Sequence, residues 1–231
     1  MEFARYAVYF CPRPETALAR FGREWLGYDC ETGESLARTS DHLLENQISQ
    51  PRRYGFHATL KPPFRLSAGV EYDDFAAAVS GLAGDLHAFT VDGLVLKELG
   101  SFLALVPRDP SDALSELAFK CVRDLDRFRA PLNSSEIAQK AANGLSPYQE
   151  HLLFTWGYPY VGDEFRFHMT LTGQLTRPEM RRAQTQLTGL VAEFERSPVE
   201  IADLCICGDP GDKQPLRVVK RFSLKVHKAP E

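Results

Sequence analysis

Two short segments of the chain share a pattern that combines an imidazole with a hydroxyl two positions later. Residues 56–60 read Phe-His-Ala-Thr-Leu and residues 167–171 read Phe-His-Met-Thr-Leu, so four of the five positions are identical. One His-x-Thr alone would indicate little, because an isolated histidine is usually a hydrogen-bonded core or surface residue. Repetition together with the threonine indicates an internal duplication that carries a function.

Both segments have the composition of β-strands, in which side chains two positions apart face the same side. His57 therefore projects together with Thr59, and His168 projects together with Thr170. The residues between and beside them face the opposite, packed side. If the two strands face each other across a duplicated core, two imidazoles and two hydroxyls converge on one cleft.

That set of groups suits phosphoester chemistry. A neutral imidazole accepts a proton from water, while a protonated one donates a proton to the leaving alkoxide. A threonine hydroxyl donates a hydrogen bond to a non-bridging phosphate oxygen. We therefore expect His57 and His168 to be the catalytic pair and Thr59 and Thr170 to bind phosphate, with no metal ion and no organic cofactor.

The same alternation adds two cations to the predicted site. Lys61 follows Thr59 on the same face if the strand persists, and Arg166 precedes His168 on the equivalent face. Either could bind an anionic substrate, and arginine is the better bidentate phosphate ligand. The competing interpretation is that both are ordinary solvated charges, and Lys61 also lies close to two prolines that turn the chain.

Other residues with chemical potential lack such a repeated context. Aromatic side chains could stack on a base or a sugar, but they more often pack in a core. Five cysteines are an odd number without further metal ligands nearby, so we interpret Cys205 and Cys207 as structural thiols. We assign no role to the remaining histidines, which are His42, His87, His151 and His227. The aromatic candidates are Tyr54, Tyr148, Tyr158 and Tyr160, and the further cationic candidates are Arg13, Arg217, Lys220, Arg221 and Lys225.

Bulk composition limits the kinds of partner. The chain has 231 residues, 44% hydrophobic and 25% charged, with a formal net charge of -4. This length suits one large domain or two small lobes that share a core. The negative balance argues against a general polyanion-binding surface, so any phosphate recognition must be local. Without a signal-like or membrane-spanning apolar run, we expect a soluble cytoplasmic protein with a small phosphorylated substrate and no membrane partner.

The hydrophobic pattern predicts the same element order after each motif, namely strand, helix, strand, strand. Short connections between strands favour an α+β fold with mainly antiparallel sheets in two packed lobes. The region 133–159 is irregular and is the best candidate for a linker. The predicted strands are 6–10, 54–60, 90–96, 101–106, 165–171, 199–206 and 218–226, and the predicted helices run through 18–26, 75–86, 114–128 and 180–194.

The two motifs, each followed by an apolar residue and carried by duplicated halves, resemble the 2H phosphoesterase superfamily. The wider contexts, residues 54–64 and 165–173, are similar to its phosphonate-metabolism-associated branch. The resemblance implies one bilobal domain over 1–231 with a central cleft flanked by outer helices. Its approximate lobes are 1–130 and 131–231, with strands exchanged between them. It also carries over His57, His168, Thr59 and Thr170 as catalytic and phosphate-binding residues.

The resemblance implies a cyclic phosphodiesterase, a hydrolase that opens a small cyclic phosphate. In the phosphonate branch the substrate would be a phosphorylated ribose 1,2-cyclic phosphate. Two alternatives stay open: a non-catalytic sensor that cradles a nucleotide or sugar phosphate, and an RNA end-processing enzyme of the same superfamily. The net charge of -4 disfavours the RNA alternative, which would need many phosphate contacts.

Overall fold

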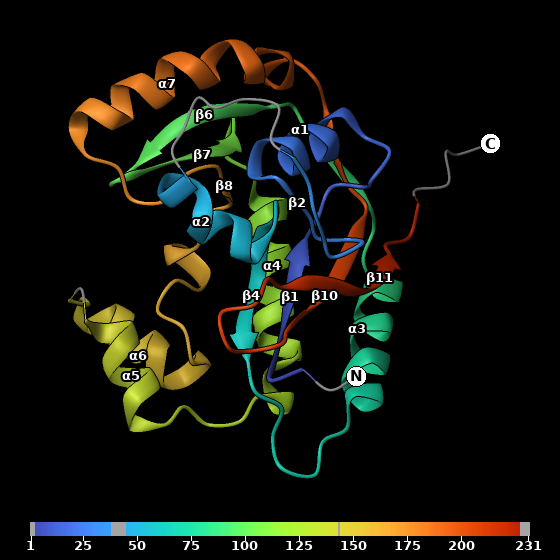
Figure 1. Ribbon diagram of the computed structural model, residues 1–231. Helices are drawn as coiled ribbons and strands as arrows, with labels where there is room; N and C mark the ends of the chain where they lie inside the picture. Colours follow the sequence, from blue (N-terminus) through green and yellow to red (C-terminus); the bar gives the residue numbers. More distant parts are fainter. Residues whose placement is uncertain (1–2, 38–44, 143, 227–231) are drawn as a thin grey trace.

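A computed structural model describes residues 3–37, 45–142 and 144–226 of the chain (Figure 1). His42 and His227 lie outside the described residues. The largest feature is a seven-stranded sheet in the order β11-β10-β1-β4-β8-β7-β6, in which all neighbouring strands are antiparallel. Its strands are β1 (Arg5–Phe10), β4 (Ala58–Phe64), β6 (Leu94–Leu99), β7 (Phe102–Pro107), β8 (Met169–Thr170), β10 (Asp203–Asp209) and β11 (Arg217–Ser223).

The sheet consists of two wings that meet at a single residue pair. The first wing holds β11, β10, β1 and β4, and the second holds β8, β7 and β6. Among the described residues, only Ala58 of β4 and Met169 of β8 pair across the junction. The α+β class and the antiparallel pairing are thus confirmed, with the two expected sheets joined into one. Each wing combines strands from 1–130 with strands from 131–231, whereas the lobe boundaries themselves stay a prediction.

Helices cover the sheet, and short strands form further small sheets beside it. Helix α7 packs on β6 and β7, α3 packs on β10 and β11, and α4 packs on β4 (Figure 1). The helices are α1 (Ala17–Leu26), α2 (Glu45–Tyr54), α3 (Tyr72–Asp85), α4 (Asp112–Asp124), α5 (Ser134–Ala141), α6 (Pro147–Trp156) and α7 (Arg177–Val191). Two small sheets pair β2 (Tyr28–Asp29) with β3 (Glu34–Ser35), and β5 (Phe89–Val91) with β9 (Val199–Ile201).

Alternation along β1 shows how the two faces of the sheet differ. Tyr6, Val8 and Phe10 belong to the large hydrophobic core under the helices. Ala7 and Tyr9 point to the other face, where they pack in a small cluster with three cysteines and Leu216. The first face therefore supplies most of the burial, and the second is available for a site.

Helix boundaries follow local capping signals. Thr16 caps α1 by accepting a hydrogen bond from the Ala19 backbone N–H, and Gly27 ends it in the left-handed conformation, as expected. The region 133–159 is not an irregular linker, because it contains α5 and α6. Both begin with a capping box, Asn133 with Glu136 and Ser146 with Gln149.

Several predicted strands are shorter or displaced. The strand predicted over 165–171 is reduced to Met169–Thr170, and the one over 54–60 begins only at Ala58, because Tyr54 ends α2. The strand predicted over 90–96 is interrupted at Gly93, which has a φ of 120°. A Cβ atom there would lie 2.4 Å from the Glu195 carbonyl oxygen, so the close approach requires glycine.

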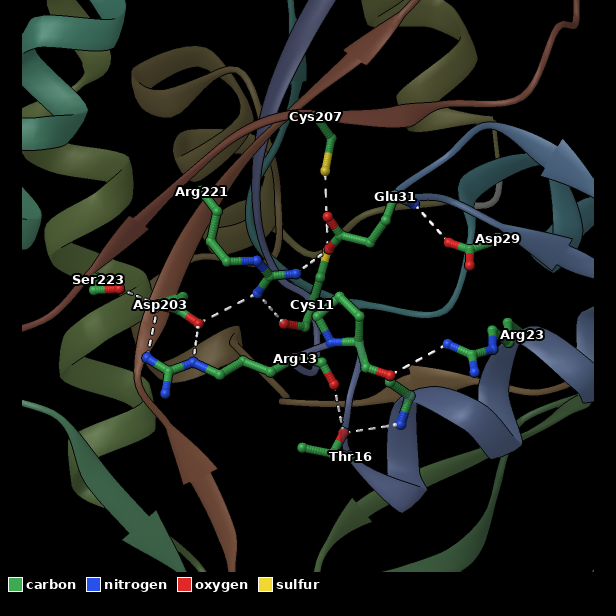
Figure 2. A network of polar contacts seen from close by, with 12 residues as sticks. Cys11, Arg13, Thr16, Arg23, Asp29, Glu31, Asp203, Cys207, Arg221 and Ser223 are labelled. Carbon is green, nitrogen blue, oxygen red and sulfur yellow. Dashed lines mark hydrogen bonds and ion pairs between the residues drawn. The ribbon is translucent and has the colours of Figure 1, made fainter.

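A buried carboxylate ties the chain segment after β1 to the C-terminal strands (Figure 2). Asp203 is 2% exposed and accepts hydrogen bonds from Arg13 Nε at 2.7 Å and Ser223 Oγ at 2.8 Å. Arg221 also contacts Asp203, donates to the Cys11 carbonyl at 2.8 Å and pairs with Glu31. Arg13 and Arg221 are therefore structural here and do not fringe the cleft.

We predict that Asp203→Ala lowers the free energy of unfolding by about 2 kcal/mol, because it leaves two arginines without their shared carboxylate. Urea denaturation at pH 7 measures this change. Ser223→Ala removes one neutral hydrogen bond from the same group and should cost about 1 kcal/mol or less. Equal stability of Asp203→Ala and the wild type would contradict the structural role.

Candidate active site

All four residues of the repeated motif line one cavity. It has a volume of about 680 Å³ and is lined by His57, Thr59, His168 and Thr170. Its other walls include residues of β1, the end of β4, the end of α2, the turn between β6 and β7, and α5. The structure thus brings together the two motif copies that the sequence separates by more than one hundred residues.

The register of the sheet explains how they meet. Ala58 pairs with Met169 in an antiparallel ladder, so continuing the register places His57 opposite Thr170 and Thr59 opposite His168. Directly opposed side chains have Cβ atoms about 5 Å apart. Because Ala58 and Met169 are fully buried in the core, their neighbours face the cavity. The two motif copies therefore meet at the Ala58–Met169 pair, with their histidines and threonines on the cavity side.

Both imidazoles are held in the same way. His57 Nδ1 lies 2.9 Å from the Gly55 carbonyl, and His168 Nδ1 lies 2.7 Å from the Arg166 carbonyl. A carbonyl oxygen only accepts, so Nδ1 carries the proton in each ring and Nε2 is left for chemistry. Gly55 adopts a φ of 72°, and a Cβ atom there would lie 2.7 Å from the Cys30 Cβ. A glycine is thus needed where the chain turns to present its carbonyl to His57.

The environment of His57 favours its neutral form. Burial lowers its pKa to about 4; the Gly55 hydrogen bond opposes this shift, and the charge of His168 adds to it. Its Nε2 lies 3.2 Å from Thr59 Oγ1, whose hydroxyl donates to the neutral ring. At neutral pH His57 therefore has the protonation state of a general base.

Tyr9 is a site residue that the sequence interpretation missed. Its ring stacks on His57 with centroids 3.8 Å apart and an interplanar angle of 20°. Tyr9 is 1% exposed and belongs to the small cluster with Cys11, Cys205 and Cys207, which supports it from behind. The signal was present in the alternation of β1, but reading it required knowing that β1 lies beside β4.

Lys61 does not face the cavity, contrary to the expectation from alternation. Tyr9 pairs with Thr59 but Val8 pairs with Lys61, so β4 contains one extra residue, a bulge. The bulge turns Lys61 into the core, where it is 1% exposed and its Nζ donates to the Val122 carbonyl at 3.1 Å. Burial lowers the pKa of Lys61 to about 8, an effect that Asp126 partly offsets.

Arg166 is also not brought into the cavity. It is exposed, and its Nη1 donates to the carbonyls of Asp163 at 2.7 Å and Phe165 at 2.6 Å. It lines a smaller neighbouring pocket of about 390 Å³ that His168 and Thr59 also border. In this structure the backbone of Arg166 orients His168, while its side chain braces its own loop.

The cavity wall contains three other cations that sequence reasoning did not select. They are Arg5 on β1, Arg65 just after β4 and Lys140 on α5, and Glu136 is the one carboxylate residue among the lining residues of the described chain. Of the four tyrosine candidates, Tyr54 and Tyr158 line the cavity, and Tyr160 lines the neighbouring pocket. These residues come from distant elements, so no local motif identifies them.

Two further observations concern the described residues only. Within residues 3–37, 45–142 and 144–226, no group of three His, Cys, Asp or Glu side chains is arranged to hold a metal ion. None of the helices in this part of the chain has the length and hydropathy that a membrane crossing requires. The cysteines are free thiols, as expected, and four of them are buried.

A family model described as "Protein of unknown function (DUF1045)" matches residues 59–217, which is more than half of the chain. The chain belongs to this family. The match includes Thr59, His168 and Thr170, and it begins two residues after His57. Membership in the DUF1045 family therefore covers most of the site without naming its chemistry.

Two curated relatives share the name "Ribose 1,5-bisphosphate phosphokinase PhnN". The protein from Janthinobacterium sp. (strain Marseille) is 38% identical over 74% of this chain and 39% of its own length. The protein from Laribacter hongkongensis (strain HLHK9) is 35% identical over 74% of this chain and 40% of its own length. The chain thus spans about two fifths of the relatives that it matches.

Solved structures with a similar arrangement include E. coli LigT complexed with 3'-AMP, at 15% identity and a TM-score of 0.48. A second is a structure described as a phosphoesterase, at 12% identity and a TM-score of 0.44. Both matches cover 97% of this chain and 99% of the other. TM-scores below 0.5 are too low to assign a function to this DUF1045 protein.

We predict that His57 titrates near pH 4, because burial disfavours its charged form, and that the free-energy of unfolding falls as pH drops from 7.5 to 5.5. In the unfolded chain this histidine has a pKa near 6.5 and binds a proton at pH 5.5, whereas in the folded protein it stays neutral. The free energy of unfolding is therefore lower by about 1 kcal/mol at pH 5.5. Imidazole NMR titration and urea denaturation at both pH values measure these effects. His57→Gln should remove this part of the pH dependence, and a His57 pKa at or above 6.5 would contradict the prediction.

A second prediction concerns the stacked ring. Tyr9→Leu removes the aromatic face against His57 and opens space beside it, so it should move the NMR-measured pKa of His57 upward by letting water in. Tyr9→Phe keeps the ring and should leave that pKa within a few tenths of the wild-type value. If both variants shift it equally, the hydroxyl rather than the stacked ring controls His57.

Proposed function

We propose that this protein is a phosphoesterase that hydrolyses a small cyclic phosphodiester by acid–base catalysis between His57 and His168. The observation that carries the proposal is the pairing of β4 with β8 beside one cavity lined by two imidazoles, each held by a backbone carbonyl, and two threonine hydroxyls.

The proposed reaction uses Nε2 of each ring. Neutral His57 removes a proton from water, and the water oxygen forms a bond to phosphorus. As the bond between phosphorus and the ring oxygen breaks, protonated His168 donates its proton to that oxygen. When the substrate binds, the Thr59 hydroxyl turns from His57 Nε2 to the phosphate, which frees Nε2 for water. Thr59 and Thr170 then donate hydrogen bonds to the non-bridging oxygens, which gain charge in the transition state. Proton exchange with solvent restores both histidines, and no step needs a metal ion.

The lowered pKa of His57 supports this division of roles. A base must be unprotonated at the working pH, and His57 meets that condition down to about pH 5 because its pKa is about 4. His168 then has the role of the acid.

For the substrate we propose a phosphorylated ribose 1,2-cyclic phosphate, within phosphonate metabolism. The wider motif contexts resemble that branch of the 2H superfamily. The relatives carry the name of a kinase that acts on ribose 1,5-bisphosphate. Opening the 1,2-cyclic ester of a ribose 5-phosphate by cleaving the bond to the 2-oxygen yields that same bisphosphate. The chain matches only part of these longer relatives. Such a partial match accords with a reaction that supplies the substrate of the kinase.

We predict that His57→Ala and His168→Ala each lower kcat for a cyclic phosphodiester by at least 100-fold, because each removes a proton-transfer group. Thr170→Val should lower it by about 10-fold or more through the loss of one phosphate hydrogen bond. Hydrolysis is measured with three substrates in the presence of a chelator. They are ribose 1,2-cyclic phosphate, its 5-phosphorylated form and a nucleoside 2′,3′-cyclic phosphate.

The control is His151→Ala, which removes an exposed imidazole on α6 and should retain wild-type activity. Circular dichroism checks that each variant is folded. Loss of wild-type activity in the chelator would contradict the mechanism. Binding of these compounds without any turnover would favour the sensor alternative, and preference for RNA ends would favour the RNA alternative.

A further inference from the structure

Positive charge is concentrated in the cavity wall of a protein that is negative overall. Arg5, Arg65 and Lys140 line the cavity, against one lining carboxylate among the described residues, Glu136, while the whole chain carries a formal charge of -4. The four motif residues that face the cyclic phosphate in the proposed reaction include no permanent cation. The three cations therefore serve something other than the reacting phosphorus.

Buried or capping carboxylates orient the two arginines. Asp209 is fully buried and accepts from Arg5 Nε at 3.0 Å. Glu136 accepts from Arg65 Nη2 at 2.9 Å and also completes the capping box of α5. Each ion pair uses Nε and Nη2, so within the described part of the chain Nη1 of Arg5 and of Arg65 has no hydrogen-bond partner. The ion pairs thus fix both guanidinium groups, and the Nη1 group of each stays available to donate hydrogen bonds.

Lys140 differs because no carboxylate pairs with it in the described structure. Its ammonium group lies over the Tyr158 ring, 5.4 Å from the centroid, at the cavity wall. Burial lowers the pKa of Lys140, and the nearby positive charge of Arg5 lowers it further, with only partial relief from Glu136. Like charges gathered at a cavity wall destabilise one another unless an anion joins them.

We propose that Arg5, Arg65 and Lys140 form a second anion subsite, which binds a terminal phosphate monoester of the substrate while its cyclic phosphate lies between His57 and His168. This inference rests on the proposed function. The cavity of about 680 Å³ lies in the size range of sites for ligands much larger than one phosphate. A monoester carries a charge of about −1.5 to −2 near pH 7, more than the single charge of a cyclic diester. The subsite therefore selects doubly phosphorylated substrates by charge.

Lys140→Gln tests the subsite against a pair of substrates, ribose 1,2-cyclic phosphate with and without a 5-phosphate. Wild-type protein should prefer the phosphorylated form in kcat/KM. Lys140→Gln should reduce that preference at least 10-fold, mainly through KM, and Lys140→Arg should restore most of it. The matched control is Lys120→Gln, which removes a lysine that pairs with Glu116 on α4, outside the cavity lining, and should leave the preference unchanged.

The outcomes separate this inference from the proposed function. Turnover without preference for the 5-phosphate, or equal losses on both substrates in Lys140→Gln, overturns the subsite and leaves the phosphoesterase intact. If the wild type turns over neither compound, the proposed function fails. Binding of ribose 5-phosphate, measured by calorimetry, then tests the subsite by itself. At least 10-fold weaker binding by Lys140→Gln than by the wild type supports the subsite, and equal binding overturns it.

Discussion

The pairing of Ala58 with Met169 is the contact on which the rest of the structure depends. It is the only ladder pair between β4 and β8 in the described structure, and it joins the two wings into one sheet. Both residues are fully buried in the main core. A slip of one residue would exchange the faces of a strand, moving a histidine and a threonine into the core. The burial of two apolar side chains thus determines that the catalytic candidates face the cavity.

A strand as short as β8 needs help to hold this register. The backbone pairs Ala104 with Thr170 and Leu105 with Met169 supply part of it. Beyond the strand, Thr172 is fully buried and its hydroxyl accepts from the Leu103 N–H at 3.0 Å. Between Thr170 and Thr172, the Leu171 carbonyl accepts from the Trp25 indole N–H at 2.8 Å. Backbone bonds also continue past the strand, because the Leu171 and Thr172 N–H groups both donate to the Leu103 carbonyl. Side-chain hydrogen bonds therefore add to a backbone pairing that extends beyond the short strand.

Sequence patterns predicted the parts of the site that depend on local periodicity. The repeat identified four residues that line one cavity, and alternation correctly placed His57 with Thr59. Alternation failed at Lys61 because the bulge in β4 adds a residue that no composition signal marks. The helices within 133–159 were missed although both capping boxes are visible in the sequence. The cations of the cavity could not be found, because they meet only through the order of strands and the placement of α5.

Duplication produces two equal motifs, but catalysis of the proposed kind needs two unequal histidines. The inequality arises outside the motifs. His57 is stacked on a buried tyrosine and has a pKa near 4. His168 instead contacts the Phe102 ring, which is tilted by 50° at a centroid distance of 5.9 Å. Differences in burial are a general means of separating an acid from a base in one site. Residues of β1 and β7 that lie outside the repeat thus give the two histidines different surroundings, on which the proposed division of roles depends.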